Sequence, residues 1–139
     1  MATFQKFNQF VEDIAKGVHN LSTGQLKVAL TNTAPVAANS VYADLTSPLA
    51  TTNLSGANPF DITTTSAEQT SGTLSLVLVD LTLTATGSVG PFRYVVLYND
   101  TPTSPADPLI GFYDYGSSVT MANAETFLID FAATTITLV

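Results

Sequence analysis

The segment from Gly90 to Asp100, GPFRYVVLYND, constrains the fold more than any other part of the sequence. Between turn-forming residues at each end lies an almost unbroken apolar run, Phe92 to Tyr98, which only Arg93 interrupts. A strand with one face in water alternates polar and apolar residues, whereas a strand covered on both faces does not. We therefore predict that this run is a central strand of a β-sandwich and that both of its faces are covered.

The two-residue repeat of a strand assigns these side chains to faces. The first face carries Phe92, Tyr94, Val96 and Tyr98, and the second carries Arg93, Val95 and Leu97. One face is expected to meet the opposite sheet, and the other to meet either an N-terminal helix or a neighbouring subunit. A lone cation on such a strand indicates a structural ion pair, so we expect Arg93 to be mostly buried and paired with Asp114.

Further strand patterns follow at short intervals. QLKVALTNT alternates apolar Leu26, Val28 and Leu30 with other residues, which predicts a half-buried strand. The alternation that starts at Leu74 shifts by one residue near Val79 and Asp80, as at a bulge or a short turn between two strands. LIGFYDYG, SSVTMANAETFLIDFA and TTITLV contribute later strands. The pattern predicts a single mainly β domain, residues 1–139, with one N-terminal helix and an antiparallel β-sandwich or jelly-roll-like fold of about seven or eight short strands.

The N-terminal segment is predicted to be that helix, over residues 3–18 with Thr3 as N-cap. Its apolar residues at spacings of three and four share one face: Phe4, Phe7, Val11, Ile14 and Val18. Phe10 lies beside this stripe and widens it. The face either covers the domain's own sheet or docks in part on a neighbouring subunit. The candidate interface residues are Phe4, Phe7, Phe10, Val11 and Ile14.

Residues 34–73 are rich in Ala, Ser, Thr, Asn, Gly and Pro. Short strands are predicted at Val41–Leu45 and Phe60–Thr64, and the remainder is predicted to be loop. Long loops in a compact domain are often functional. This segment is therefore either an extended contact arm or a variable surface, and the N-terminal helix and the C-terminal TTITLV are further candidate contact elements.

The composition narrows the classes of function. Charged residues make up 11% of the chain, against roughly 25% in an average soluble domain, so a partner can cover broad surfaces without desolvating charges. The net charge is −7, and Lys6, Lys16, Lys27 and Arg93 form no cluster, so we expect no binding to nucleic acid. No basic amphipathic stretch, membrane-spanning run or export signal is recognised, so we expect no membrane contact.

The residues that carry chemistry are few. His19 is the only histidine, and it is predicted to be a capping or surface residue because no serine nucleophile motif accompanies it. The chain has no Cys, and its carboxylates are scattered, so we expect no metal or cofactor site and no enzymatic activity. Tyr98, Tyr113 and Tyr115 could stack on a sugar ring as in a carbohydrate-binding module, although ordinary strand aromatics are the simpler interpretation.

Four longer stretches carry a resemblance to a known family. FVEDIAKGVHNL, LKVALTNTAPVAANSV, GPFRYVVLYND and LIGFYDYGSSVTMANAETFLIDF occur in this order and cover over a third of the chain. In this arrangement the chain resembles small virion structural proteins of tailed bacteriophages. The resemblance implies a non-enzymatic role, with capsid decoration (cement) favoured and a tail or neck component as the alternative. It also implies the major capsid protein or another virion protein as partner, a homo-oligomer, often a trimer, and a place on the capsid surface after synthesis in the host cytoplasm.

Overall fold

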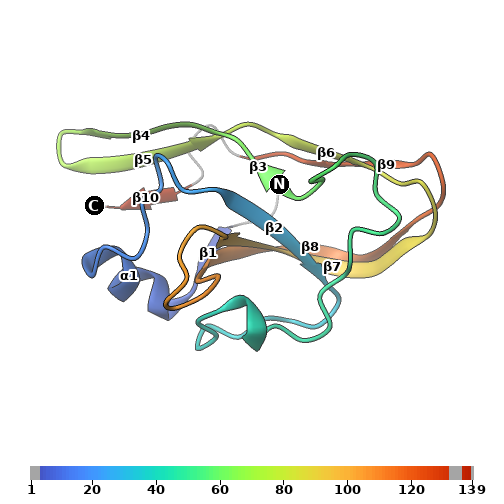
Figure 1. Ribbon diagram of the computed structural model, residues 1–139, viewed down its shortest axis with the longest axis horizontal. Helices are drawn as coiled ribbons and strands as arrows, with labels where there is room; N and C mark the ends of the chain where they lie inside the picture. Colours follow the sequence, from blue (N-terminus) through green and yellow to red (C-terminus); the bar gives the residue numbers. More distant parts are fainter. Residues whose placement is uncertain (1–3, 132–135, 139) are drawn as a thin grey trace.

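Ten β-strands, one α-helix and one 3-10 helix make up the fold in the computed structural model, which describes residues 4–131 and 136–138 (Figure 1). Their bounds are β1 Phe4–Lys6, α1 Asn8–Ala15, β2 Leu26–Thr31, η1 Tyr42–Asp44, β3 Asp61–Ile62, β4 Thr64–Thr70, β5 Thr73–Leu78, β6 Leu81–Thr84, β7 Val89–Asn99, β8 Leu109–Met121, β9 Thr126–Ile129 and β10 Ile136–Leu138. The strands pair in antiparallel fashion in a sandwich-like fold with one α-helix, which confirms the predicted fold class. The strands outnumber the predicted seven or eight, partly because β1 and β3 are pieces of only three and two residues.

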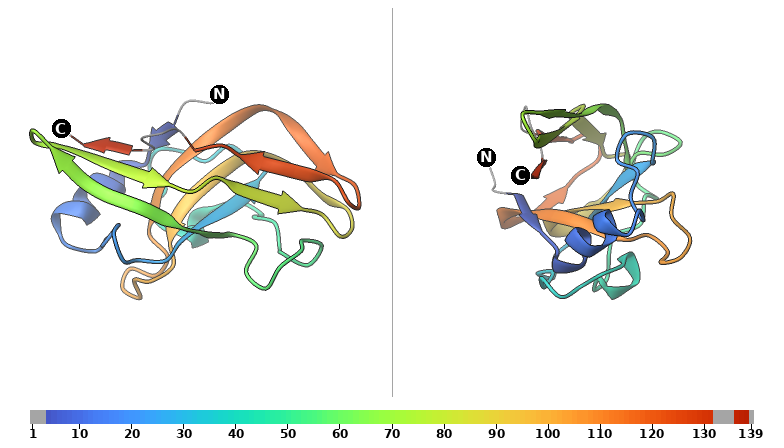
Figure 2. Two further views of the ribbon diagram at one scale, coloured as in Figure 1. Left: turned by 90° about the horizontal axis from the view of Figure 1, so that it is seen from above. Right: turned by 90° about the vertical axis from the view of Figure 1, so that its left-hand side faces the viewer.

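The two layers of the sandwich enclose the main core. One layer is the sheet β1-β8-β7-β2-β3, and the other consists of the sheet β10-β5-β4 and the pair β6-β9 (Figures 1 and 2). The main core is the apolar cluster between them, and its fully buried members include Phe10, Leu26, Leu76, Leu83 and Leu97. Val79 and Asp80 separate β5 from β6, so the predicted break in the leucine pattern is a short connection between two strands.

β7 is the middle strand of the five-stranded sheet, which confirms the central position predicted for Phe92 to Tyr98. The predicted assignment of faces is wrong near its start. The register between β7 and β8 is irregular on both sides of Phe92, and this irregularity shifts the two-residue repeat. Phe92 therefore packs in the main core with Val95 and Leu97, while the guanidinium of Arg93 lies over the Tyr94 ring.

The chain itself covers the other face of this sheet. A second apolar cluster, here called the outer cluster, has the buried members Phe7, Ala29, Leu45, Val96, Leu109 and Phe112. Leu45 comes from the segment that carries η1, which runs below the sheet in Figure 1, on the side away from β4 and β5. Because Ala29 packs in this cluster, β2 is buried on both faces, and the predicted half-buried strand is wrong.

Residues 34–73 differ from the predicted loops and strands. The strand predicted at Val41–Leu45 is a 3-10 turn, because the N–H groups of Asp44 and Leu45 bond to carbonyls three residues back. β3 confirms part of the strand predicted at Phe60–Thr64. Apart from Thr64, β4 occupies a stretch predicted to be loop. Within the described residues it is an edge strand paired with β5, and its polar sequence TTSAEQT lacks the apolar alternation that would signal a strand.

The predicted helix over residues 3–18 is also shorter in the structure. α1 spans eight residues, and Thr3, the predicted N-cap, lies outside the described residues. Phe4 instead belongs to β1, which pairs with β8. Gly111 of β8 permits this pairing, because a Cβ there would lie 2.6 Å from the backbone carbonyl oxygen of Gln5 in β1. Sheet pairing has overridden the helical spacing of the apolar residues. Of the predicted C-terminal strand TTITLV, residues 134, 135 and 139 lie outside the described residues, and residues 136–138 form β10.

Candidate functional site

The predicted interface on the N-terminal segment does not form one surface. Phe7 and Phe10 are each 0% exposed, Phe7 in the outer cluster and Phe10 in the main core. Phe4 and Ile14 are partly buried against the main core, and Val11 is 54% exposed. The predicted interface is therefore wrong as a set, because the strand-to-helix transition before Asn8 sends the two phenylalanines into different apolar clusters.

Asp13, His19 and Asn99 form a buried polar group beside α1, with exposed fractions of 3%, 9% and 1%. Nδ2 of Asn99 lies 3.2 Å from Nδ1 of His19, and the Phe10 ring stands edge-on to the imidazole at 5.2 Å. Burial lowers the pKa of His19, and the charge of Asp13 opposes this shift. The prediction of a capping or surface histidine is wrong. Its side-chain hydrogen-bond partner is the amide of Asn99.

The predicted ion pair between Arg93 and Asp114 is present. Nε and Nη2 of Arg93 donate to the two carboxylate oxygens at 2.8 and 3.1 Å, a bidentate arrangement. The hydrogen bond from Arg93 is the main cause that lowers the pKa of Asp114, and the N–H of Gly116 adds to it. The expectation that Arg93 is mostly buried is wrong, because its side chain is 39% exposed. The pair therefore lies at the surface.

The three tyrosines considered for sugar stacking do not form one platform. Tyr113 and Tyr115 line one hollow on β8, whereas Tyr98 packs against the outer cluster and its ring lies 4.9 Å from that of Tyr42. Tyr98 is therefore on the opposite face of the five-stranded sheet from Tyr113. A common sugar site made by all three is excluded.

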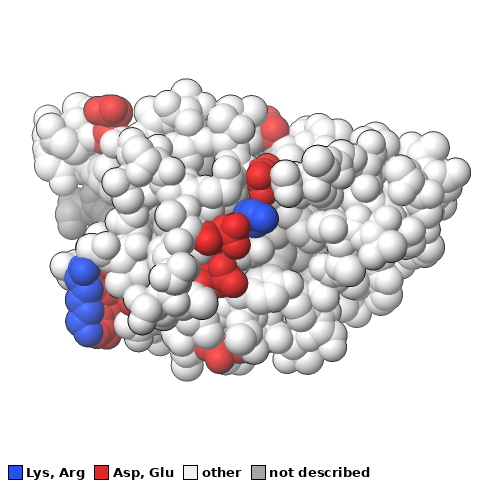
Figure 3. Space-filling view, in the orientation of Figure 1, with Lys and Arg blue, Asp and Glu red and all other residues white. Residues whose placement is uncertain are grey.

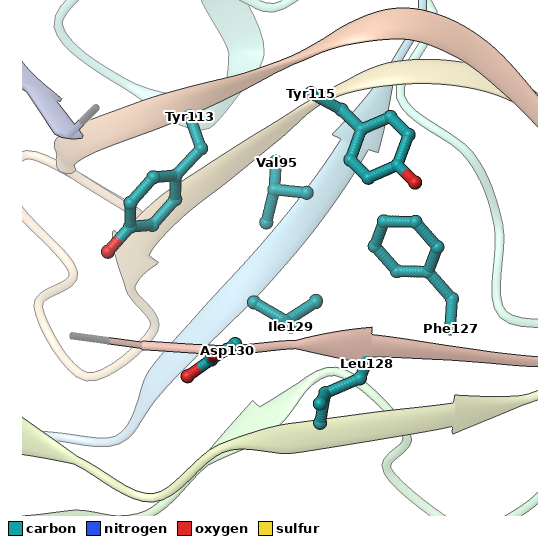
Figure 4. A pocket seen from close by; sticks show the side chains of 7 residues that line it. All are labelled: Val95, Tyr113, Tyr115, Phe127, Leu128, Ile129 and Asp130. Atoms are coloured by element: carbon teal, nitrogen blue, oxygen red, sulfur yellow. The ribbon is translucent and has the colours of Figure 1, made fainter. Parts of the chain in front are cut away.

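An apolar hollow of about 240 Å³ lies between β8 and β9. Its lining, here called the β8–β9 hollow, consists of Val95, Tyr113, Tyr115, Phe127, Leu128, Ile129 and Asp130 (Figure 4). Phe127 and Ile129 point toward the sheet that carries Val95, and the Tyr115 and Phe127 rings meet edge-on at 5.2 Å. Tyr115 and Leu128 are each 55% exposed. The hollow is suited to apolar packing, with Asp130 as its one carboxylate.

A second hollow, of about 320 Å³, is polar. Its lining, here called the Lys27 hollow, consists of Lys27, Tyr42, Leu49, Ala50, Thr51, Ala57, Asn58, Pro59, Phe60, Asp61 and Tyr98. Nζ of Lys27 lies 3.4 Å from Asp61 and 3.5 Å from Asp100. On the face shown in Figure 3, one blue patch lies among red atoms near the middle of a largely white surface. Burial alone would lower the pKa of Lys27, but the two carboxylates raise it.

Residues 4–131 and 136–138 contain no group of three His, Cys, Asp or Glu residues arranged to hold a metal ion. No helix in this part of the chain has the length and apolar character needed to cross a membrane. Comparison of the chain with protein-family models, with curated proteins and with solved structures finds no match.

Proposed function

We propose that the chain is a non-enzymatic virion structural protein of a tailed bacteriophage that decorates the capsid. It binds the major capsid protein or another virion protein and associates with its own copies, as a trimer. The proposal rests on the resemblance of its sequence segments to virion proteins and on one structural observation, the β8–β9 hollow.

The β8–β9 hollow supports a contact function because its apolar side chains reach solvent beside a core that is already closed. Tyr115 and Leu128 each expose 55% of their surface. By contrast, the apolar side chains of β7 such as Val95 and Val96 are buried in the main core and in the outer cluster. Exposed aromatic and aliphatic side chains in one place are typical of protein contacts. Asp130 is the only formally charged residue in the lining, so a partner covers this hollow at a small desolvation cost.

The number of copies per particle tests the proposed role. Virions of the phage that encodes the chain are purified, and the chain is quantified by mass spectrometry against the major capsid protein. Decoration predicts several hundred copies per particle. A count of about six or twelve would place the chain in the neck or tail instead, since those parts follow low cyclic symmetry. Absence from purified particles would refute a virion role.

Paired surface variants test the contact itself. Leu128→Asp puts a charge into the hollow, whereas Val36→Asp puts one on a side chain of similar exposure, 58%, outside the hollow. Each purified variant is added to particles that were assembled without the chain, and the bound copies are counted. We expect Leu128→Asp to bind in about tenfold fewer copies than the unchanged chain and Val36→Asp to bind in equal number, while both variants keep the same melting temperature. Equal occupancy of both variants would show that the hollow is not the contact.

A further inference from the structure

The Lys27 hollow has walls that the fold itself fixes. Lys27 of β2 lies beside Tyr98 of β7 on one side and Asp61 of β3 on the other in the antiparallel register. Backbone bonds hold the surrounding loops to the sheet: Val28 N–H donates to the Phe60 carbonyl at 2.9 Å, and Leu49 N–H donates to the Leu30 carbonyl at 2.8 Å. Tyr42 N–H donates to the Asp107 carbonyl at 2.9 Å. A hollow with walls held in this way is preorganised, which lowers the entropy cost of binding.

The charges around this hollow favour a neutral polar ligand. Asp61 and Asp100 both contact the ammonium group of Lys27. Burial raises the pKa of Asp107, and a hydrogen bond between Asp107 and Asp100 raises it further. Asp61 and Asp100 already outnumber the one cation between them, and this negative balance repels an anion. These carboxylates do not form a metal-binding group within the described residues.

Two tyrosines give the hollow aromatic surface and hydroxyl donors. The Tyr42 and Tyr98 rings are half-buried, with centroids 4.9 Å apart and planes inclined by 51°. Burial and neighbouring charges raise the pKa of both phenols, and no hydrogen bond from the described residues contributes to either shift. Because the pKa of each phenol lies above its ordinary value, both hydroxyls stay protonated near neutral pH and can donate a hydrogen bond. Asn58 and Thr51 add amide and hydroxyl groups to the lining.

We propose that the Lys27 hollow binds one neutral hexose ring. A hexose has an apolar ring face that packs on an aromatic ring, and its hydroxyl groups both donate to carboxylates and accept from lysine, amide and phenol groups. The volume of about 320 Å³ lies at the small end of ligand sites, which fits one ring better than a chain of rings. For a ligand of this size we expect a dissociation constant on the order of 1 mM. This site is independent of the proposed virion role.

The test is a nuclear magnetic resonance titration of the ¹⁵N-labelled full chain. The probes are glucose, galactose and mannose, each as the free sugar and as the methyl glycoside, up to about 10 mM. We expect saturable amide shifts confined to the residues around the hollow. Binding of the methyl glycosides assigns the ring to a glycan chain, whereas binding of free sugars alone assigns it to a soluble sugar. Glucose 6-phosphate is the anionic control, which the carboxylates are expected to reject.

Variants locate the site. Tyr42→Phe combined with Tyr98→Phe removes two hydroxyl groups, and we expect about tenfold weaker binding. Ala57→Trp fills the hollow and should abolish binding, whereas Tyr115→Phe and Ala38→Trp, both outside the lining, should bind normally. No shifts with any sugar, shifts elsewhere on the surface, unchanged binding by Ala57→Trp, or equal binding of glucose 6-phosphate would each overturn the proposal.

Discussion

Replacement of Phe10 by alanine measures how far the fold depends on α1. The Phe10 ring is 0% exposed in the main core and meets the His19 imidazole edge-on at 5.2 Å. The alanine variant lacks the whole aromatic ring and therefore leaves a cavity in the core. The five-stranded sheet has apolar side chains packed on both faces, so it cannot easily shift to fill that cavity. We expect the free energy of unfolding to fall by about 3–5 kcal/mol. This loss is a large share of the roughly 5–15 kcal/mol that stabilises a typical domain.

The assay is guanidinium unfolding followed by circular dichroism, with the transition midpoint and slope fitted for each variant. Val11→Ala is the matched control, because Val11 is the next residue of the same helix and is 54% exposed. The control is expected to change stability by less than about 0.5 kcal/mol. Phe10→Leu, which keeps more of the buried volume, should lose less than Phe10→Ala and remain measurable if the alanine variant does not fold.

The same measurements separate a core role from a contact role for Phe10. A loss below about 1 kcal/mol for Phe10→Ala, combined with weaker self-association in sedimentation, would mean that the ring serves a neighbouring subunit. The structural placement of Phe10 would then be wrong. Equal losses for Phe10→Ala and Val11→Ala would refute the burial argument as well, because only removal of the buried Phe10 ring should leave a cavity in the core.

Three further predictions concern polar groups and backbone. Because Arg93 and Asp114 lie at the surface, Arg93→Leu should lower the unfolding midpoint in a denaturant titration only slightly. Asp114→Ala should lower it more, since it also leaves the N–H of Gly116 without its acceptor. A large effect of Arg93→Leu would show that the pair is buried. Burial lowers the pKa of folded His19 below the unfolded value of 6.5, so the free energy of unfolding should fall as the pH drops below about 6.5. His19→Gln should flatten this part of the curve of stability against pH. An unchanged slope in the variant would rule out this linkage. Gly72→Ala should lower the free energy of unfolding by about 1–2 kcal/mol in thermal unfolding, because Gly72 has φ +84°, which an alanine adopts only with strain. The added Cβ meets no atom within 4 Å, so the cost comes from the backbone and not from a clash. A neutral result would mean that the hairpin turn relaxes.

The sequence was informative where one local pattern reflects one environment. The apolar run around Val96 predicted a central strand covered on both faces, and the order of strand patterns predicted the fold class. The N-terminal helix was overestimated because the spacing of Phe4 and Phe7 suits a helix as well as a strand that continues into one. The pairing of Phe4 with β8 also depends on the missing Cβ of Gly111, more than a hundred residues away, and no pattern near Phe4 signals it.

The candidate sites were harder to predict because they join distant parts of the chain. The pair of Arg93 and Asp114 could be predicted, since one lone cation on a strand calls for a carboxylate on a neighbouring strand. The Lys27 hollow could not, because the residues between Lys27 and Asp61 read mainly as loop and the sequence does not show how they return to the sheet. The sequence carries a weak signal for the β8–β9 hollow, the unbroken apolar run from Phe127 to Ile129. In a strand the middle residue of such a run points away from its neighbours, and Leu128 is accordingly 55% exposed while Ile129 is buried.

The two hollows share no lining residue, which allows both proposals to hold together or fail separately. The β8–β9 hollow includes Val95 and Tyr113, which pack in the main core, whereas the Lys27 hollow includes Tyr98, which packs on the outer cluster. A subunit bound at the first hollow therefore leaves the second open to a sugar. We expect Leu128→Asp to retain sugar binding and Ala57→Trp to retain normal occupancy on particles. Loss of both properties in either variant would indicate a change of the shared sheet, because each substitution touches only one hollow.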